Sequence, residues 1–535
     1  MFKSTKLRGT VQGVFVWQKG LFFYLYSLKM TRYDAVIIGS GMGGLCTAYI
    51  LAKEGMKVCV LEKNRQIGGS LQIFSRDKTI FDTGVHYIGA LDEGQNLNRY
   101  FKYFGLMDAL KLHRMDMDGY DVITFAGDDN KYPHAQGYEN FVEQLCKFFP
   151  EERANLNLYI QKVREVCAAF PLYNLDSGRK DFVNAWYLST DAKTFIDSIT
   201  KNKRLAEVLG GSNILYAGLE NVTPFYVHAL VVNSYIESSY RCIDGSSQIT
   251  RHLSDSIKKM GGEIFNYSEA VRFHFKGDEI DEVELKNGEH IAGKLFISGI
   301  DLAKTVDMVE GPQLRAAYKN RIKGLENSCS SFIVNAVVKE DSYPYFNHNV
   351  YHYRIPNVWN GPMYNKSDWP EAVAVFPGTS SKHPNFTENF TAMAYMTFDE
   401  VKKWENTFHT IPNYEDGRGQ DYEDFKAEKA EKILDNVFLR LPELKGKIKS
   451  YTTATPLTYR DYIGTRDGTL YGVIKDYNEP LKSFITPRTK VKNLLLTGQN
   501  INLHGVMGVT VNAVVTCSEV LGHPYLIDKI KATVD

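Results

Sequence analysis

Val36-Ile37-Ile38-Gly39-Ser40-Gly41-Met42-Gly43-Gly44-Leu45 is the stretch of sequence that decides the fold of this chain. It leads from an apolar run that begins at residue 33 into a helical pattern that continues to residue 53, and a second apolar run follows at residues 58–61. Glycines at the first, third and sixth positions of the turn allow a sharp bend, a close approach of a pyrophosphate to the backbone and close packing of helix on strand. The helix N-terminus adds free N–H groups and positive dipole charge. This order predicts a βαβ unit that binds an adenine dinucleotide.

Glu62, at the end of the second strand, discriminates among dinucleotides. Its carboxylate is placed to accept hydrogen bonds from a ribose diol and repels the extra phosphate of NADP, so FAD and NAD remain. The segment that follows, with the pair Gly68-Gly69, favours FAD because small residues let the backbone pass beside a long cofactor. A plain turn is the alternative for this pair. From these motifs we predict cofactor contacts at Gly39, Gly41, Met42, Gly43, Gly44, Glu62, Lys63, Gly68, Gly69 and Ser70.

The composition is that of a globular protein with more than one domain. A chain of 535 residues is too long to fold around one ordinary hydrophobic core. Its content of 44% hydrophobic and 24% charged residues is typical of globular proteins. The 63 basic and 63 acidic residues balance, so we expect no nucleic-acid partner. The seven cysteines are widely spread without a C-x-x-C or a zinc-site spacing, so we expect reduced, mostly buried thiols, a reducing compartment and no metal site.

The first 30 residues precede the dinucleotide unit. Basic residues at 3, 6 and 8 followed by apolar runs resemble a signal peptide, but Gln18-Lys19-Gly20 interrupts the runs and no small-residue cleavage site follows. The uninterrupted runs are also far shorter than the ~20 residues that span a bilayer. We interpret residues 1–30 as an extension with a mis-assigned start, the alternative start being Met30, and an interfacial membrane segment is the other interpretation.

The patterns along the chain predict two interleaved domains. A cofactor domain takes residues 31–100, 232–305 and 451–535, and a substrate domain takes residues 101–231, predicted to be helical, and 306–450, predicted to mix strands and helices.

Two finer predictions concern the middle of the chain. Val283 to Ile291 reads as a hairpin with an Asn-Gly turn. Eight aromatic residues lie between residues 343 and 369, where strand packing is one interpretation and an apolar substrate tunnel is the other.

A glycine-rich block near the C-terminus predicts a second backbone cradle for a cofactor. Thr497-Gly498-Gln499-Asn500 follows an apolar strand, and His504-Gly505-Val506-Met507-Gly508 opens an apolar helix. With Phe81-Asp82-Thr83-Gly84-Val85-His86-Tyr87-Ile88-Gly89 and the first turn, this block resembles the FAD-dependent superfamily of phytoene desaturases, carotenoid isomerases and retinol saturases. The resemblance covers nearly the whole chain from residue 32 and is closest to the all-trans-retinol 13,14-reductase (retinol saturase) branch.

The resemblance implies a fold and a set of contacts. The fold is α/β: a discontinuous FAD-binding Rossmann-like domain of the GR2 type, as in amine oxidases and phytoene desaturases, with a mixed α+β substrate domain. Flavin contacts are implied at Gly498, Gln499, Gly505, Val506 and Gly508, and a backbone contact with the adenine is implied at Val271.

The resemblance also implies an FAD-dependent oxidoreductase that saturates, desaturates or isomerises a carbon–carbon double bond of a hydrophobic polyene or isoprenoid, such as a retinoid or carotenoid. For saturation we rank the proton donors His504, Tyr471, His86 and Tyr87, and packing or orientation of the cofactor is the alternative for each. Two departures, Asp244 in place of a glycine and His504 in place of a small or thiol residue, leave the reduced alkene open.

Two other classes share this architecture. One is a flavin amine oxidase, for which Cys517 is a candidate flavin link without a matching motif, and the other is a non-catalytic prenyl-binding escort protein. The chain has only one Gly-x-Gly-x-x-Gly turn, so NAD(P)H would visit as a transient electron donor, or electrons would come from a protein or a quinone. We expect a cytoplasmic protein that contacts the inner face of a membrane peripherally, and the sequence does not fix its oligomeric state.

Overall fold

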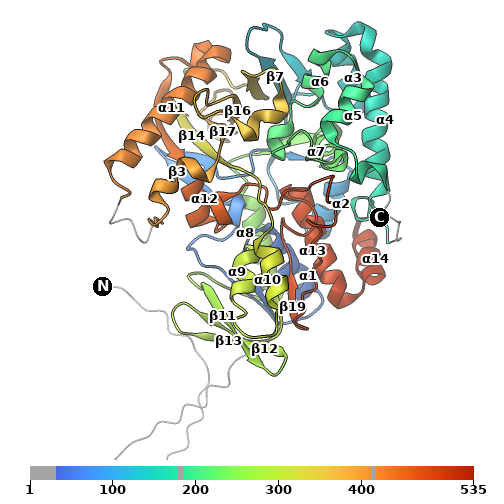
Figure 1. The fold of residues 1–535 in the computed structure, drawn as a ribbon, viewed down its shortest axis with the longest axis vertical. Coiled ribbons are helices and arrows are strands. Elements are labelled where there is room, and N and C mark those ends of the chain that lie inside the picture. Colours follow the sequence, from blue (N-terminus) through green and yellow to red (C-terminus); the bar gives the residue numbers. More distant parts are fainter. Residues whose placement is uncertain (1–31, 178–184, 411–416, 535) are drawn as a thin grey trace, which may run out of the picture.

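The computed structural model describes residues 32–177, 185–410 and 417–534 (Figure 1). Two seven-stranded sheets form its frame, one in the lower and one in the upper half of the view. The N-terminal extension predicted for residues 1–30, including the alternative start at Met30, lies outside the described residues.

The lower sheet contains the predicted βαβ unit. Strand β1 (Tyr33–Ile38), helix α1 (Met42–Lys53) and strand β2 (Val58–Leu61) follow one another as expected. β1 lies between β2 and β13 (His290–Ser298) and is parallel to both, and β19 (Leu494–Leu496) pairs with β13 in the same direction. The apolar runs of these strands are largely buried on both faces, as parallel strands between helices must be. The predicted Rossmann-like α/β fold is confirmed.

Beyond β13 the lower sheet becomes antiparallel. β11 (Ala270–Lys276), β12 (Glu279–Leu285) and β13 form a meander, in which β12 lies between the other two strands. The predicted hairpin joins β12 to β13, and Gly288 in its turn has a φ of 85°, a left-handed conformation that glycine adopts without strain. At the opposite edge, β10 (Glu263–Phe265) pairs with β2.

The upper sheet has the strand order β18-β14-β17-β16-β15-β7-β8. These strands are β18 (Ile448–Ala454), β14 (Ser330–Val338), β17 (Asn389–Met396), β16 (Ala372–Pro377), β15 (Asn349–Tyr353), β7 (Asp121–Phe125) and β8 (Tyr132–His134). Its two faces pack against different hydrophobic cores. Residues such as Phe332 and Val334 pack in one core with the long helix α11 (Gln420–Arg440), whereas Ile333 between them joins the core on the other face. The sheet is therefore buried on both sides.

A group of helices covers one end of the upper sheet (Figure 1). These are α3 (Tyr138–Cys146), α4 (Arg153–Ala169), α5 (Ala192–Ile199), α6 (Lys203–Leu209) and α7 (Phe225–Glu237). The helical prediction for residues 101–231 needs a correction, because strands β7 and β8 lie within this range. β7 pairs with the later strand β15 on one side and with β8 on the other. The predicted boundary at residues 231 and 232 also falls inside α7, whose apolar face runs on across it. Pairing with a strand over 200 residues away is not visible in local spacing.

The remaining elements complete both halves. The helices are α2 (Asn96–Tyr103), α8 (Ser247–Lys259), α9 (Leu302–Asp307), α10 (Ala316–Lys323), α12 (Pro456–Tyr462), α13 (Gly505–Leu521) and α14 (His523–Val534). The strands are β3 (Ile73–Arg76), β4 (Thr79–Asp82), β5 (Ile88–Gly89), β6 (Leu112–Arg114) and β9 (Ser239–Cys242).

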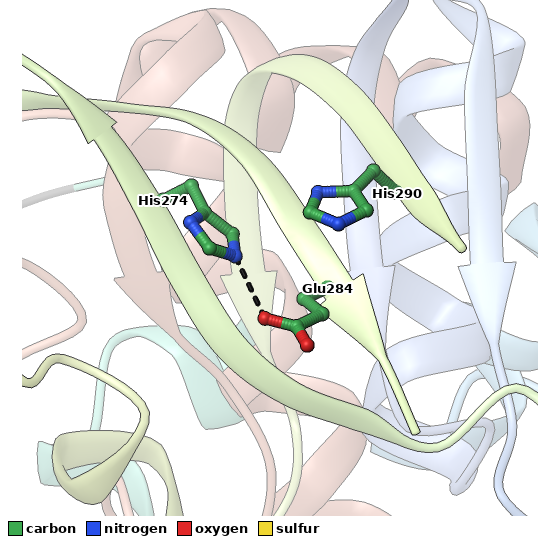
Figure 2. A group of neighbouring side chains, drawn as sticks. All are labelled: His274, Glu284 and His290. Atoms are coloured by element: carbon green, nitrogen blue, oxygen red, sulfur yellow. Dashed lines mark hydrogen bonds and ion pairs between the residues drawn. The ribbon is translucent and has the colours of Figure 1, made fainter. Parts of the chain in front are cut away.

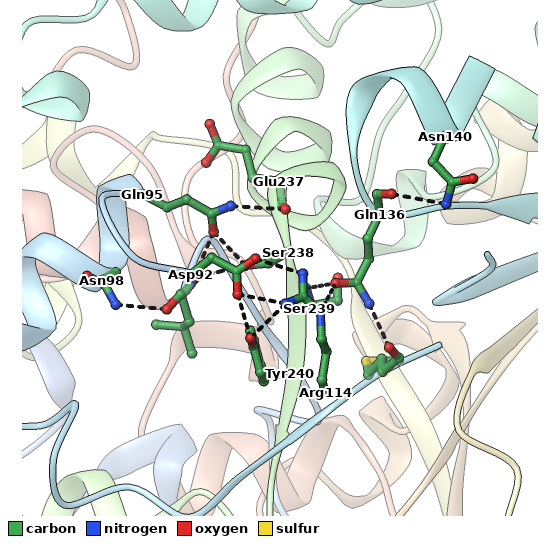
Figure 3. A network of polar contacts seen from close by, with 12 residues as sticks. Asp92, Gln95, Asn98, Arg114, Gln136, Asn140, Glu237, Ser238, Ser239 and Tyr240 are labelled. Atoms are coloured by element: carbon green, nitrogen blue, oxygen red, sulfur yellow. Dashed lines mark hydrogen bonds and ion pairs between the residues drawn. The ribbon is translucent and has the colours of Figure 1, made fainter. Parts of the chain in front are cut away.

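A polar network ties the end of α7 to β6, β9 and the loop after β5 (Figure 3). Asp92 accepts two hydrogen bonds from the guanidinium of Arg114, at 3.0 and 2.7 Å, and a third from the hydroxyl of Tyr240 at 2.5 Å. Gln136 accepts from the backbone N–H of Ser239 at 3.0 Å and from Nε of Arg114 at 3.2 Å. Because charge-assisted bonds are stronger than neutral ones, they hold the loop after β5 against β6 and β9.

Two predictions about residue classes can be compared with the structure. All seven cysteines are free thiols, six of them buried and Cys329 half-buried. The eight aromatic residues between 343 and 369 do not line the large cavity; Tyr351, Tyr353, Trp359 and Trp369 are among those packed in the cores. Strand and core packing, rather than a tunnel, accounts for them. Within the described ranges no helix is both long and apolar enough to cross a membrane.

Candidate functional site

One large cavity, of about 560 Å³, has walls from both sheets and falls within the usual size range of small-molecule sites. Eighteen of the twenty predicted site residues lie on its wall. They are Gly39, Gly41, Met42, Gly43, Glu62, Lys63, Gly68, Gly69, Ser70, His86, Tyr87, Val271, Tyr471, Gly498, Gln499, His504, Gly505 and Val506. The structure thus gathers them at one site, while their individual roles stay predictions.

The glycines of the first turn create space and contact at the mouth of α1. A Cβ on Gly41 would meet nothing within 4 Å, so this backbone faces open cavity. A Cβ on Gly43 would lie 2.9 Å from the Cα of Gly498, which brings the first and last motifs of the chain into direct contact. The N-terminus of α1 and the N-terminus of α13 therefore open onto the same cavity, and both present positive dipole ends to it.

The two predicted residues that do not line the cavity are packing glycines. A Cβ on Gly44 would stand 2.1 Å from the carbonyl oxygen of Gly39, and one on Gly508 would stand 2.4 Å from that of Leu503. Gly44 thus lets α1 lie close on its preceding turn, as the motif predicts. Gly508 has a packing role at the first turn of α13, and its flavin contact stays a prediction.

Glu62 is buried at the carboxyl end of β2 and helps to shape the glycine turn. Its carboxylate accepts hydrogen bonds from the backbone N–H and the hydroxyl of Ser40, at 3.2 and 2.5 Å, and from the backbone N–H of Asn64 at 2.8 Å. An ionised carboxylate has about four lone-pair sites, so one remains for a ligand hydroxyl. Glu62 lies where the sequence predicts a ribose partner.

A segment at the end of α12 covers this part of the cavity. Lys63 donates to the carbonyl of Asp461 at 2.6 Å, and Lys304 donates to the carbonyl of Gly464 at 2.8 Å. Desolvation lowers the pKa of Lys63, and the positive charge of Lys304 lowers it further. Two ammonium groups held this close provide a favourable environment for an anionic ligand.

His86 and Tyr87 form the wall between the cavity and the upper sheet. The ring of His86 stacks on Phe376 with centroids 4.7 Å apart, and desolvation lowers the pKa of His86 to about 3, so it is neutral at pH 7. The hydroxyl of Tyr87 donates to Asp121 at 2.9 Å and lies 2.8 Å from that of Tyr351. Burial raises the pKa of Asp121 to about 7, so a proton is available behind the wall.

Tyr471 and His504 form a pair at the apolar end of the cavity. Their ring centroids are 4.7 Å apart. The hydroxyl of Tyr471 donates to the carbonyl of Ile214 at 2.6 Å, and Nε2 of His504 lies 3.2 Å from the carbonyl of Leu215. That contact assigns the proton to Nε2, and burial lowers the pKa of His504 to about 4. At neutral pH His504 is therefore an uncharged group, not a strong acid.

The comparisons with known proteins agree with this geometry. A family profile described as an NAD(P)-binding Rossmann-like domain matches residues 37–104. The chain is 28% identical over 541 residues to all-trans-retinol 13,14-reductase of Homo sapiens, across 92% of this chain and 86% of the human protein. It is 22% identical over 464 residues to prolycopene isomerase 1 of an Oncidium hybrid cultivar, across 82% and 75% of the two chains. The chain therefore resembles the all-trans-retinol 13,14-reductase branch of the phytoene desaturase and carotenoid isomerase superfamily.

Solved structures support the fold of this chain. An oxidoreductase from Methanosarcina mazei has a TM-score of 0.60 at 15% identity, covering 90% of this chain and 98% of the other. Cyclohexylamine oxidase from Brevibacterium oxydans has a TM-score of 0.57 at 14% identity, covering 94% and 100%. At such identities the likeness concerns architecture alone.

The amine-oxidase interpretation finds no support in Cys517. Its side chain is fully buried in α13, where its thiol lies 3.7 Å from the carbonyl of Thr47 and does not line the cavity. Burial also raises the pKa of this thiol, which disfavours the reactive thiolate. A flavin link through Cys517 would require this helix to unpack.

Several residues of the cavity wall are not marked by any of the sequence motifs. The apolar wall is formed by Ile333, Phe376 and Met393, which come from three strands of the upper sheet. In sequence they read as ordinary buried strand residues, so no local signal marks them. Gly464 also lines the cavity, and its φ of 89° is a backbone conformation that favours glycine. For this residue the glycine itself was the local signal in the sequence.

Proposed function

We propose that this protein is an FAD-dependent oxidoreductase that adds hydrogen across a carbon–carbon double bond of a hydrophobic polyene or isoprenoid. The observation that carries the proposal is one cavity with two unlike ends. Its glycine-rich end carries two helix N-termini and the carboxylate of Glu62, and its other end is lined by Ile333, Phe376 and Met393. The relatives with retinol reductase and prolycopene isomerase activity in their names support the same substrate class.

The residues present fit an FAD. Glu62 offers an acceptor to the ribose of the adenosine, the backbone of Gly39 to Gly43 and the dipole of α1 suit the pyrophosphate, and Gly498 to Val506 would hold the flavin. The open space over Gly41 is where the backbone allows phosphate to approach. When bound, FAD supplies hydride chemistry at its N5 atom.

The chain's own groups would position the substrate and hold the proton. The stacked pair of His86 and Phe376 and the residues of the upper sheet exclude water from the apolar end. Because both histidines are neutral at pH 7, neither provides an imidazolium acid. Burial keeps the hydroxyl of Tyr471 protonated, and we place it first as the donor to the second carbon of the alkene.

The sequence carries one Gly-x-Gly-x-x-Gly turn, and the Rossmann match covers residues 37–104 only. We infer that the reductant reaches the flavin transiently, as NAD(P)H or as a reduced protein or quinone. In the same cavity, desaturation would pass two electrons from the substrate to the flavin, and isomerisation would involve no net electron transfer.

Anaerobic flavin spectroscopy tests the proposed function. The protein is loaded with FAD, reduced with dithionite and mixed with retinol, a carotenoid or a matched isoprenoid alcohol without double bonds. Reoxidation of the flavin by a polyene but not by the saturated alcohol is expected. Failure of every polyene, together with reduction of the oxidised flavin by an amine, would overturn the proposal.

Tyr471→Phe tests the proton donor within this assay. General acid catalysis contributes about 10²- to 10⁴-fold, so turnover should fall by at least about a hundredfold while FAD affinity is unchanged. The solvent deuterium effect on turnover should change as well, which simple loss of packing would not cause. Tyr459→Phe, at another tyrosine on the cavity wall, is the matched control and should retain turnover.

We further propose peripheral contact with a membrane, from which an apolar substrate is collected. Leu481 and Phe484 are 73% and 56% exposed on one loop, which supports such a contact. Co-sedimentation with phosphatidylcholine vesicles should fall in a Leu481→Ser, Phe484→Ser variant. Equal sedimentation of the variant and the wild type would rule out this loop as the contact.

A further inference from the structure

The open face of the β11–β12–β13 meander carries two histidines and a glutamate that converge (Figure 2). One ligand atom each of His274, Glu284 and His290 lies within 4.8 Å of the other two. Nε2 of His274 is 2.8 Å from Oε2 of Glu284, and the two imidazole rings have centroids 4.9 Å apart. All three side chains are half-buried, so an ion in solvent can reach them.

The strand register explains why these side chains meet. In the antiparallel pairing His274 lies opposite Glu282, and Glu284 lies opposite His290. Residues two apart on a strand share a face, so Glu282 and Glu284 both point to the side occupied by the histidines. The observed bonds run diagonally, from His274 to Glu284 and from Nδ1 of His290 to Glu282 at 2.7 Å.

The bond to Glu282 prepares His290 as a ligand. A carboxylate bound to one ring nitrogen fixes the tautomer and the orientation of an imidazole, and leaves the other nitrogen to bind a metal. In His290 the remaining nitrogen is Nε2. A carboxylate is one of the partners, with a backbone carbonyl or a water, that metal-binding histidines have on their other ring nitrogen.

The local charge favours a divalent cation. Glu282 and Glu284 bring two carboxylates to the cluster. Arg272 lies 3.8 Å from Glu284, but its Nε is engaged by Glu310 at 3.0 Å. Two imidazoles and one carboxylate are a ligand set typical of zinc and similar borderline transition metals, with room for water as a further ligand.

We propose that His274, Glu284 and His290 bind one Zn²⁺-class ion, with Glu282 as the residue that positions His290. The ion would fasten the three strands of the meander to one another. Strand β11 begins at Ala270, and its first two residues, Ala270 and Val271, line the cavity. The proposed metal site lies further along the same strand, at His274. This inference does not depend on the proposed oxidoreductase activity.

Zinc titration of the full-length protein tests the site. The protein is dialysed against EDTA and then buffer, and ZnCl₂ binding is measured by calorimetry and by metal analysis after desalting. One ion per chain is expected in the wild type, and the His274→Gln, His290→Gln double variant should lose it. Glu282→Gln should weaken binding by about ten- to a hundredfold, since supporting carboxylates contribute that much.

A matched control distinguishes this site from incidental binding by histidine. His348→Gln alters a half-buried histidine with a single carboxylate partner, Asp116 at 3.2 Å, and should bind zinc like the wild type. Circular dichroism spectra confirm that each variant is folded. The proposal is overturned if the wild type takes up no zinc under these conditions, or if the folded double variant still takes up one ion with unchanged affinity.

Discussion

At the scale of single residues, Glu62 supports the fold and is the predicted partner of a ribose. Its carboxylate already holds the backbone of Ser40 and Asn64, so it shapes the turn that would receive a dinucleotide. A ribose hydroxyl donating to the same carboxylate would form a charge-assisted bond worth about 1.5–3 kcal/mol. The Glu62→Ala variant should therefore bind FAD about ten- to a hundredfold more weakly, as measured by quenching of flavin fluorescence. Glu93→Ala, at an exposed ion pair with Lys102, is the control; equal affinity in both variants would place the ribose elsewhere.

Asp121 gives a second residue-scale prediction, on stability. Burial raises its pKa to about 7, well above the ordinary value of 3.8 for an aspartate. A carboxyl group that binds its proton more tightly when folded stabilises the fold fully below pH 4, and this contribution is lost as the pH rises through 7. Between pH 5 and pH 8 the wild type should lose about 2–3 kcal/mol from this group. Urea denaturation at both pH values should show a smaller loss in Asp121→Asn, whereas Asp129→Asn on an exposed loop should behave like the wild type. An identical loss in all three proteins would mean that Asp121 ionises normally.

At the scale of elements, the first turn separates packing from ligand binding. A methyl group on Gly44 would collide with the carbonyl oxygen of Gly39, while one on Gly41 would enter open cavity, and Gly41 has a φ of −60° that alanine adopts readily. Gly44→Ala should thus lower the free energy of unfolding by about 1–3 kcal/mol or more, as overpacking does. Gly41→Ala should keep the wild-type melting temperature yet bind FAD more weakly. Melting curves and flavin titrations of both variants check this; the reverse pattern would refute the assigned roles of the two glycines.

The same elements show what sequence can and cannot predict here. β1, α1, the hairpin at Gly288 and the start of α13 were predictable because each is specified by a local signal: an apolar run, a glycine at a turn or a helical period. Phe376 and Met393 were not predictable as cavity residues, because their position depends on how strands of the upper sheet pair across the molecule. His274 and His290 likewise come together only through strand register, so no local sequence pattern indicated that they would be neighbours.

At the scale of the whole molecule, the cavity joins segments that are far apart in the chain. Its wall contains Gly43 of α1, Gly498 just after β19, and Phe376 of β16 in the upper sheet. A ligand that spans the cavity therefore contacts both halves of the protein, whereas a shorter ligand contacts one. This arrangement lets a cofactor stabilise the contact between the two sheets as well as its own pocket.

Thermal stability with ligands of different length tests this arrangement. FAD at a hundred times its dissociation constant should stabilise the fold by about 2.7 kcal/mol, which raises the melting temperature of the cofactor-free protein. ADP at the same concentration reaches only the end at Glu62 and α1, and riboflavin reaches only the end at Gly498 and α13, so each should give a smaller rise. NAD serves as a dinucleotide of similar length without a flavin. If ADP or NAD raises the melting temperature as much as FAD does, the flavin end of the cavity contributes nothing to binding, and the assignment of Gly498 to Val506 as the flavin cradle is wrong.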